Sequence, residues 1–306
     1  MISDKDIKKV FSRIMPDYTI ESIKNYSKGQ VNEIFFVSLI NEAKNIEEEL
    51  VLRIYPSDGW KAEKEKYLFN LVMKKTSVLV PGVIITDTSK KIINYNYAIL
   101  KRVLGEELGE SKNKKLVKEA GKILAEIHTI KFDSFGWIVG KKIEPKFKKW
   151  VDFLEFDLKH KIKKAKSKLP KKLVVDILDY FERNKELLDI VTVPSLLHKD
   201  YSYAHIIVDK EINGIIDWEW AIAGHHEFDL VKSLLWMFEK DKKREKIFLS
   251  GYKKQGKLSK DFEKRRKIYE LLIFFNSFVF STECKSKLWC RYNLAEIKEL
   301  LYGKHS

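Results

Sequence analysis

Apolar and polar residues follow one pattern in the first third of the chain and a different one in the rest. Up to about Leu100, short apolar runs bounded by turn residues predict β-strands, with one amphipathic helix at about residues 61–74. From Lys114 onward, apolar residues recur mainly at helical spacing. The change of pattern predicts two lobes, a strand-rich one over residues 1–101 and a helical one over residues 102–306.

Two acids and a histidine follow short apolar runs in the second half of the chain. Asp200 lies on a turn, His205 comes five residues later, and Asp217 ends the next apolar run. Phosphoryl transfer needs one carboxylate that faces the attacking hydroxyl and a second that holds Mg²⁺, because the protein contributes mainly positioning and charge neutralisation. We assign these roles to Asp200 and Asp217, and an auxiliary metal or orienting role to His205. A turn acid, a core histidine and a strand-end cap are the structural alternatives.

This segment resembles the aminoglycoside phosphotransferase family, the antibiotic kinases related in fold to choline kinases and eukaryotic protein kinases. The usual family loop is His-x-Asp followed by four residues and an Asn, and here His198 and Asp200 match while His205 replaces the Asn. That variant resembles the kinases that act on the 2″-hydroxyl of aminoglycosides. Residues 217–221 and 224–230 resemble the metal-binding segment of the family and the helix start that follows it.

The resemblance implies an α+β, bilobal protein-kinase-like fold, with a small antiparallel β N-lobe that binds the nucleotide and a larger helical C-lobe that carries the catalytic loop. It implies that Asp200 is the catalytic acid, Asp217 the Mg²⁺ ligand and His198 a scaffold residue. Asp229 matches a structural acid of the family. Its position also predicts a cap near the start of a helix that runs to about Phe238.

A kinase also needs a nucleotide site upstream of its catalytic loop, and residues 27–32 are the first candidate. This turn precedes an apolar strand at residues 34–37, and its backbone N–H groups could cover phosphates. We assign Ser27, Gly29 and Asn32 to nucleotide binding. Because the turn contains a single glycine, an ordinary hairpin turn is the alternative.

The next predicted strand, residues 49–55, carries one cation, Arg53, among its apolar residues. Kinases generally place a lysine here to hold the α- and β-phosphates, and an arginine stays charged and can fork onto phosphate oxygens. A buried charge without a partner is costly, so a carboxylate of the following helix should lie within reach of Arg53. Glu65 is our candidate, and Glu63 is the competing one.

A further strand, residues 97–100, leads into residues 101–105, which resemble the hinge of the family. The resemblance implies that backbone groups near Lys101 and Val103 meet a purine and that Ile99 packs against it. Side-chain identity at a hinge says little, so ATP and GTP both stay open as the phosphoryl donor.

Composition limits the classes of protein without selecting one. No apolar run approaches the roughly 18 residues that span a membrane, and acids occupy the N-terminus where a secretory signal would be basic and then apolar. We therefore expect a cytoplasmic protein with no membrane partner. The net charge of +15 raises nucleic acid as an alternative partner, but the lysines are scattered along the chain and favour a solvated surface. Cys284 and Cys290 match no metal or redox spacing.

The sequence thus predicts a monomeric small-molecule kinase that uses Mg²⁺ and ATP or GTP. An aminoglycoside is the first expected acceptor, and a choline-like compound, an amino sugar or a macrolide is the alternative. Trp218, Trp220 and Trp236 could line an acceptor pocket or pack in the core. The replacements at Arg53 and His205 leave a second alternative, a degenerate kinase that binds nucleotide without turnover.

Overall fold

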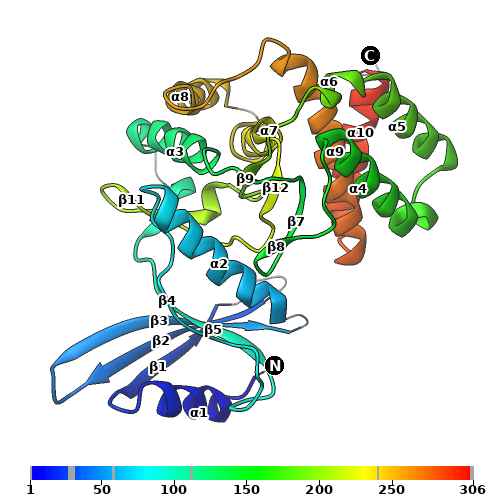
Figure 1. The fold of residues 1–306 in the computed structure, drawn as a ribbon. Helices are drawn as coiled ribbons and strands as arrows, with labels where there is room; N and C mark the ends of the chain where they lie inside the picture. Colours follow the sequence, from blue (N-terminus) through cyan, green and yellow to red (C-terminus); the bar gives the residue numbers. More distant parts are fainter. Residues whose placement is uncertain (1, 27–31, 57–58, 111–112, 240, 304–306) are drawn as a thin grey trace. The chain divides into compact units, whose positions relative to one another are not determined.

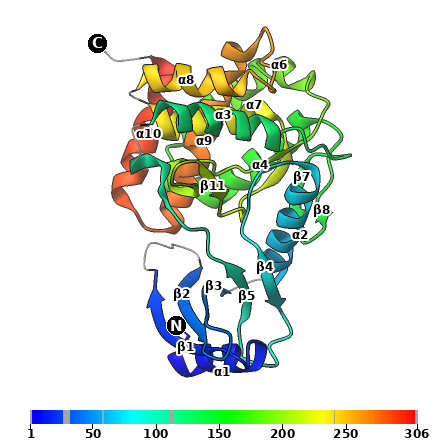
Figure 2. The ribbon, with the colours of Figure 1, turned by 90° about the vertical axis from the view of Figure 1, so that its left-hand side faces the viewer.

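The computed structural model describes residues 2–26, 32–56, 59–110, 113–239 and 241–303 (Figure 1, Figure 2). The chain divides into two compact units. The first comprises Met1–Lys112, Ile138–Lys142 and Ala204–Glu219, and the second comprises Asn113–Trp137, Ile143–Tyr203 and Trp220–Ser306. Antiparallel sheets and helices together confirm the predicted α+β class. The sequence division between residues 101 and 102 stays a prediction.

The first unit is built on a five-stranded antiparallel sheet with the strand order β1-β2-β3-β5-β4. Its strands are β1 (Thr19–Asn25), β2 (Glu33–Asn41), β3 (Ile46–Tyr55), β4 (Val83–Asp87) and β5 (Asn96–Lys101). Alternate residues of β3, namely Leu50, Leu52 and Ile54, are fully buried in one core with α1 (Asp4–Ile14). Because side chains alternate along a strand, Arg53 lies on the opposite face of the sheet.

Two helices accompany this sheet (Figure 1). Helix α1 begins where the Ser3 hydroxyl accepts the N–H of Asp6, which satisfies one of the donors left free at a helix start. Helix α2 (Gly59–Lys75) agrees with the helix predicted at residues 61–74. Its buried face includes two charged residues, Lys64 and Glu65, beside apolar ones. Charges are almost never fully buried unless they are paired, so this face needs ionic partners.

The segment 204–219 gives the first unit a second, small sheet. Strands β10 (Ile206–Val208) and β11 (Ile212–Ile215) form a hairpin, and β10 also pairs with β6 (Glu106–Glu107). Gly105 has a φ of +132°, and a Cβ there would lie 2.4 Å from the carbonyl oxygen of Val208. Only glycine permits this approach, which joins the end of the hinge segment to the end of β10, the strand that follows His205.

The second unit is mainly helical. Its helices are α3 (Lys114–Ile127), α4 (Trp150–Ala165), α5 (Lys171–Arg183), α6 (Glu186–Asp189), α7 (His226–Phe238), α8 (Lys242–Tyr252), α9 (Phe262–Glu283) and α10 (Lys287–Tyr302). The chain also contains short 3-10 turns at Leu108–Glu110, Lys166–Lys168 and Tyr203–His205. Strand β12 (Ile222–Gly224) pairs with β9 (Ser195–Leu197) and with β7 (Gly136–Val139), and β8 (Lys142–Ile143) follows β7. The short strand β9 leads directly to Asp200.

Helices α3 and α8 pack closely in this unit, as both views show (Figure 1, Figure 2). A Cβ on Gly121 would lie 2.1 Å from the carbonyl oxygen of Phe248, and one on Gly251 would lie 1.8 Å from that of Lys118. Glycine on each helix therefore lets the two backbones meet. Among the described residues, the structure contains no helix that is both long and apolar enough to cross a bilayer.

Candidate active site

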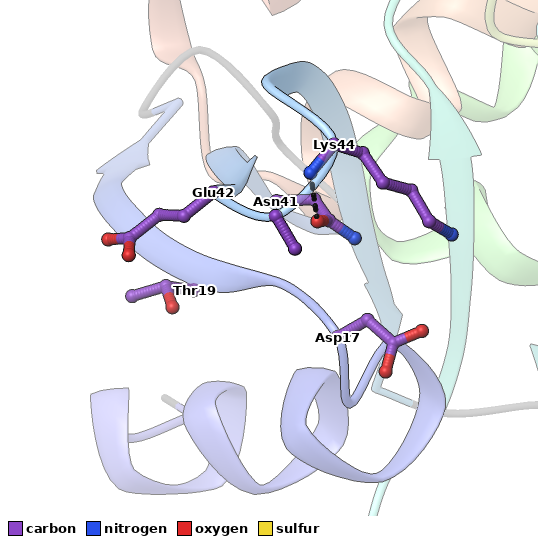
Figure 3. A pocket seen from close by; sticks show the side chains of 6 residues that line it. Asp17, Thr19, Asn41, Glu42 and Lys44 are labelled. Carbon is purple, nitrogen blue, oxygen red and sulfur yellow. Dashed lines mark hydrogen bonds between the residues drawn. The ribbon is translucent and has the colours of Figure 1, made fainter.

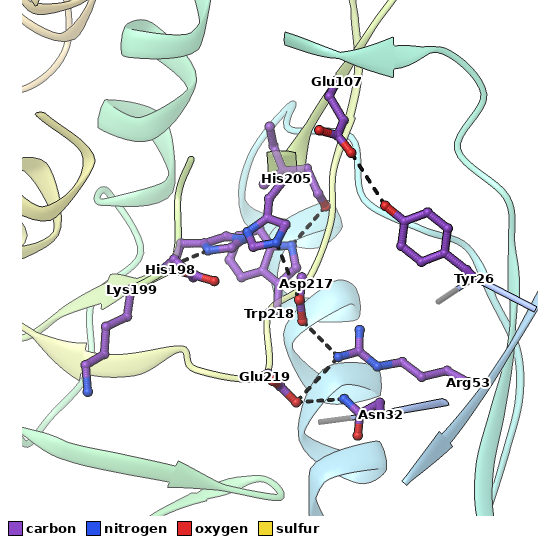
Figure 4. Close-up of polar contacts among 12 residues, drawn as sticks. Tyr26, Asn32, Arg53, Glu107, His198, Lys199, His205, Asp217, Trp218 and Glu219 are labelled. Atoms are coloured by element: carbon purple, nitrogen blue, oxygen red, sulfur yellow. Dashed lines mark hydrogen bonds and ion pairs between the residues drawn. The ribbon is translucent and has the colours of Figure 1, made fainter. Parts of the chain in front are cut away.

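Arg53 is the centre of a buried ionic cluster in the first unit (Figure 4). Its side chain points from β3 to three carboxylates. Nη1 lies 3.2 Å from Glu65 Oε1, whereas Nη2 lies 2.8 Å from Asp217 Oδ1 and 3.5 Å from Glu219 Oε2. Burial by itself would lower the pKa of Arg53, but Glu65 and Asp217 raise it well above its ordinary value. The guanidinium is therefore a fixed positive charge.

Glu65 is the carboxylate of helix α2 that pairs with Arg53. It is only 1% exposed, and its other oxygen accepts a hydrogen bond from the hydroxyl of Tyr55, which lies two residues after Arg53 on β3. Burial raises the pKa of Glu65, and the charge of Arg53 opposes that shift. The competing candidate, Glu63, is half-buried on the same helix. The geometry thus decides between the two acids in favour of Glu65.

Asp217 follows β11 in a left-handed conformation, with a φ of +63°. Backbone strain of this kind in a non-glycine residue is held by its surroundings and is concentrated at functional sites. The preceding N–H, that of Ile216, donates to the carbonyl oxygen of His205 at 3.0 Å. His205 Nε2 lies 3.5 Å from Asp217 Oδ2. The two residues that the sequence assigned to a metal therefore lie side by side.

Sequence reasoning missed two members of this cluster, Lys64 and Glu219. Lys64 is 3% exposed, and its ammonium donates to the backbone oxygen of Glu219 at 2.6 Å. Burial lowers the pKa of Lys64 to about 7. The Glu219 carboxylate also accepts from the side-chain amide of Asn32 at 2.7 Å. Asn32, which the sequence assigned to the nucleotide, thus joins the cluster, whereas Ser27 and Gly29 lie outside the described residues.

The hinge residues lie where the last strand of the sheet ends. The N–H of Lys101 donates to the carbonyl oxygen of Gly82 at 2.7 Å, and Val103 is half-buried two residues further on. Their assignment to a purine stays a prediction. Ile99 requires a correction. In the register of β3 and β5, Arg53 lies opposite Ala98, and Ile99 is fully buried in the core on the other face. Ile99 therefore cannot contact a nucleotide held on the face of Arg53, and the prediction is wrong.

The loop with Asp200 belongs to the second unit. His198 is fully buried, and its Nδ1 accepts the N–H of Asp200 at 3.3 Å. Lys199, between them, has a φ of +63°. Lys232 on α7 lies 3.1 Å from Asp200 Oδ1. His198 thus orders the backbone on either side of a strained residue, which supports the scaffold role that the resemblance implies.

Asp229 supports this loop and is not a helix cap. Helix α7 begins after His225, whose side chain makes no capping hydrogen bond. The Asp229 carboxylate instead accepts the N–H groups of His198 at 2.7 Å and Lys199 at 2.8 Å. It also contacts His128 Nε2 at 3.2 Å, and His128 Nδ1 contacts the Tyr252 hydroxyl at 2.9 Å. The predicted cap is therefore wrong, because the carboxylate serves a loop thirty residues upstream.

The three tryptophans considered for an acceptor pocket differ in burial. Trp218 is fully buried, and its indole donates to the carbonyl oxygen of Ile215 at 3.0 Å, so it is a core residue. Trp220 is 41% exposed, and Trp236 is half-buried.

The hollow in Figure 3 lies at the β2–β3 turn, lined by Asp17, Thr19, Asn41, Glu42, Ala43 and Lys44. Asn41 is seven residues along β2 from the partner of Arg53, roughly 23 Å away. This hollow therefore has no part in the chemistry.

The first unit thus joins a fixed cation, its orienting glutamate and an acid with a neighbouring histidine, and the second unit presents a carboxylate on a braced loop. These are the parts of a kinase. No curated protein matches the sequence. The Phosphotransferase enzyme family matches residues 22–267, and the chain belongs to that family. This membership confirms the predicted family and enzyme class, a small-molecule kinase.

Solved structures of similar fold include three aminoglycoside phosphotransferase structures. APH(4)-Ia has a TM-score of 0.74 at 15% identity, over 99% of this chain and 100% of that one. The GDP and kanamycin complex of APH(2″)-IIIa has a TM-score of 0.68 at 13% identity, over 96% and 97%. The streptomycin–ATP–APH(2″)-IIa complex has a TM-score of 0.67 at 18% identity, over 98% and 99%. The likeness confirms the predicted protein-kinase-like fold.

Proposed function

We propose that the chain transfers a phosphoryl group from ATP or GTP to a hydroxyl of a small molecule, with Mg²⁺ as cofactor. The observation that carries the proposal is the geometry at Arg53. One guanidinium nitrogen is held by Glu65, and the other points at Asp217. Because a guanidinium presents its donors in a rigid fork, Glu65 orients the side chain, and the other nitrogen lies beside Asp217, the proposed metal ligand, where a metal-bound phosphate would meet it.

The donor set at Asp217 fits Mg²⁺. Asp217 offers hard carboxylate oxygens, which Mg²⁺ prefers, and it is 28% exposed at its side chain. Among the described residues, three carboxylates gather here, those of Glu65, Asp217 and Glu219, around the cations Arg53 and Lys64. Asp217 also lies 3.5 Å from His205, and a group of acids of this kind favours a bound metal ion. Asp217 would hold the metal, and His205 would serve as an auxiliary ligand or orient the site. The bound ion would neutralise phosphate charge.

Asp200 has the acceptor role in this proposal. Its carboxylate takes up the proton of the attacking hydroxyl, while the nucleotide is held by Arg53 and the residues of the first unit. The backbone that carries Asp200 is fixed by His198 and Asp229, so the carboxylate does not have to be ordered when substrate binds. Preorganisation of this kind is what phosphoryl transfer requires of a protein.

An aminoglycoside is the first acceptor to test, since structural neighbours were solved with gentamicin, kanamycin and streptomycin. A choline-like compound, an amino sugar and a macrolide are the alternatives. The test is nucleotide consumption across these four classes, with ATP and GTP in parallel and Asp200→Asn as the inactive control. Acceptor-dependent consumption that is lost in the control supports the proposal. Nucleotide binding without consumption for any acceptor favours a degenerate kinase instead. A cytoplasmic location and a monomeric state stay predictions.

A further inference from the structure

Helix α7 holds the Asp200 loop through two residues on one of its faces. Asp229 and Lys232 are three positions apart, which places both side chains on the same side of the helix. Asp229 accepts the N–H groups of His198 and Lys199. Lys232 donates to the carbonyl oxygen of Lys199 and to Asp200 Oδ1, the latter at 3.1 Å. One helix face therefore binds both sides of the strained Lys199 peptide, and it also reaches the reacting carboxylate.

The ammonium that lies 3.1 Å from Asp200 Oδ1 belongs to this helix. The loop has a base of its own at Lys199, directly before Asp200, and none among the three residues that follow Asp200. Another lysine, Lys161 on α4, is close enough for Lys232 to affect its ionisation, but Lys161 pairs with its own acid, Asp157, at 2.5 Å. Lys232, in contrast, directs its ammonium to the loop, to Asp200 and to the carbonyl oxygen of Lys199.

Partial burial gives this contact more weight than a surface ion pair. The Lys232 side chain is 21% exposed, and that of Asp200 is 29% exposed. Surface pairs are worth little because water and salt screen them. Here the same ammonium also makes a backbone hydrogen bond, so a single group fixes the path of the chain at Lys199 and the direction of the Asp200 carboxylate.

We propose that Lys232 is a positioning residue for Asp200: it holds the carboxylate and the Lys199 peptide in the geometry that receives the acceptor hydroxyl. The inference rests on the proposed function, in which Asp200 takes the proton of that hydroxyl. A misplacement of 1 Å at a reacting group can cost about a hundredfold in rate. Loss of Lys232 should therefore lower kcat and leave the nucleotide KM unchanged, because Lys232 lies with the acceptor carboxylate and not with the Arg53 cluster.

The experiment compares Lys232→Met and Lys232→Arg with a matched control, Lys149→Met. Lys149 also pairs with an aspartate, Asp189, at 2.8 Å, but both side chains are about half exposed and lie away from the loop sequence. We expect Lys232→Met to lower kcat about 10- to 100-fold with a nucleotide KM within about twofold of wild type. Lys232→Arg should recover most of kcat, since it keeps the charge and the donors. The control should match wild type.

Amide hydrogen exchange over residues 198–203 gives a readout that does not need turnover. Exchange there should rise several-fold in Lys232→Met and return in Lys232→Arg, with other peptides unchanged. If wild type phosphorylates no acceptor, the proposed function fails, and the exchange data alone then decide whether Lys232 orders the loop. Unchanged exchange, a kcat within about threefold of wild type or a change in nucleotide KM alone overturns the inference. If Lys232→Met does not fold, Lys232→Gln takes its place.

Discussion

Replacing Glu65 with glutamine separates the charge of this residue from its shape. The amide keeps the volume of the side chain and can still accept from the Tyr55 hydroxyl, but it no longer neutralises Arg53. Breaking a buried ion pair from one side costs about 3–5 kcal/mol when the remaining charge is left without compensation. Arg53 retains Asp217 at 2.8 Å and Glu219 at 3.5 Å. We therefore expect the free energy of unfolding to fall by only about 1–2 kcal/mol.

The effect on catalysis should be larger than this modest loss of stability suggests. Without the charge of Glu65, the Nη1 side of Arg53 loses its ion pair, and the guanidinium can turn further toward Asp217, the proposed metal ligand. We expect kcat/KM to fall about 10- to 100-fold in Glu65→Gln, which corresponds to about 1.4–2.7 kcal/mol. Arg53→Ala should lose about 10²- to 10³-fold, because it removes the phosphate contact itself.

A double-mutant cycle tests whether Glu65 acts only through Arg53. The double variant should be little worse than Arg53→Ala alone, so the coupling energy should nearly equal the effect of Glu65→Gln. Initial rates at saturating Mg²⁺ give kcat/KM, and thermal unfolding checks that each variant is folded. Glu63→Gln, a half-buried glutamate on the same helix, is the control and should match wild type. Additive losses, or an equal loss in the control, would refute the proposed orienting role.

Three further predictions address the other residues. Asp200→Asn should lower kcat by about 10²- to 10⁴-fold with nearly unchanged nucleotide affinity, and a variant that keeps more than about a tenth of wild-type kcat would remove Asp200 from its role. Asp217→Ala should weaken Mg²⁺-dependent nucleotide binding, measured by titration at several Mg²⁺ concentrations, and equal affinities for variant and wild type would exclude it as the ligand. Burial lowers the pKa of His226 from 6.5 to about 4, so the unfolded chain binds the proton first as the pH falls. The contribution of His226 to the free energy of unfolding should therefore fall by roughly 2 kcal/mol between pH 7.5 and pH 5. Urea titrations at both pH values measure this fall, and the part due to His226 should be absent in His226→Gln.

Much of the fold and part of the site follow from local patterns in the sequence. The helix predicted at residues 61–74 and the strand with Arg53 both agree with the structure, since the period of apolar residues differs between the two. Helical spacing also favours Glu65 over Glu63 as the partner of Arg53. Glu65 is three and seven positions before the buried Leu68 and Val72, so it shares their face, whereas Glu63 does not.

The two errors have a common physical cause, because each depended on a contact between distant parts of the chain. The face of Ile99 is set by the register of β5 against β3, and a shift of one residue exchanges the two faces of a strand. An acid in the first turn of a helix usually serves that helix, but Asp229 instead accepts amides of the loop that follows β9. No local pattern distinguishes these outcomes.

The arginine at position 53 is best understood from the number of acids around it. A lysine ammonium is a compact point charge, whereas a guanidinium spreads its donors over a planar fork. Arg53 uses one end of that fork for Glu65 and the other for Asp217 and Glu219. The adjacent buried cation, Lys64, donates instead to the backbone oxygen of Glu219. The replacement of lysine by arginine is therefore matched by its surroundings, which supports the proposed phosphate-binding role of Arg53.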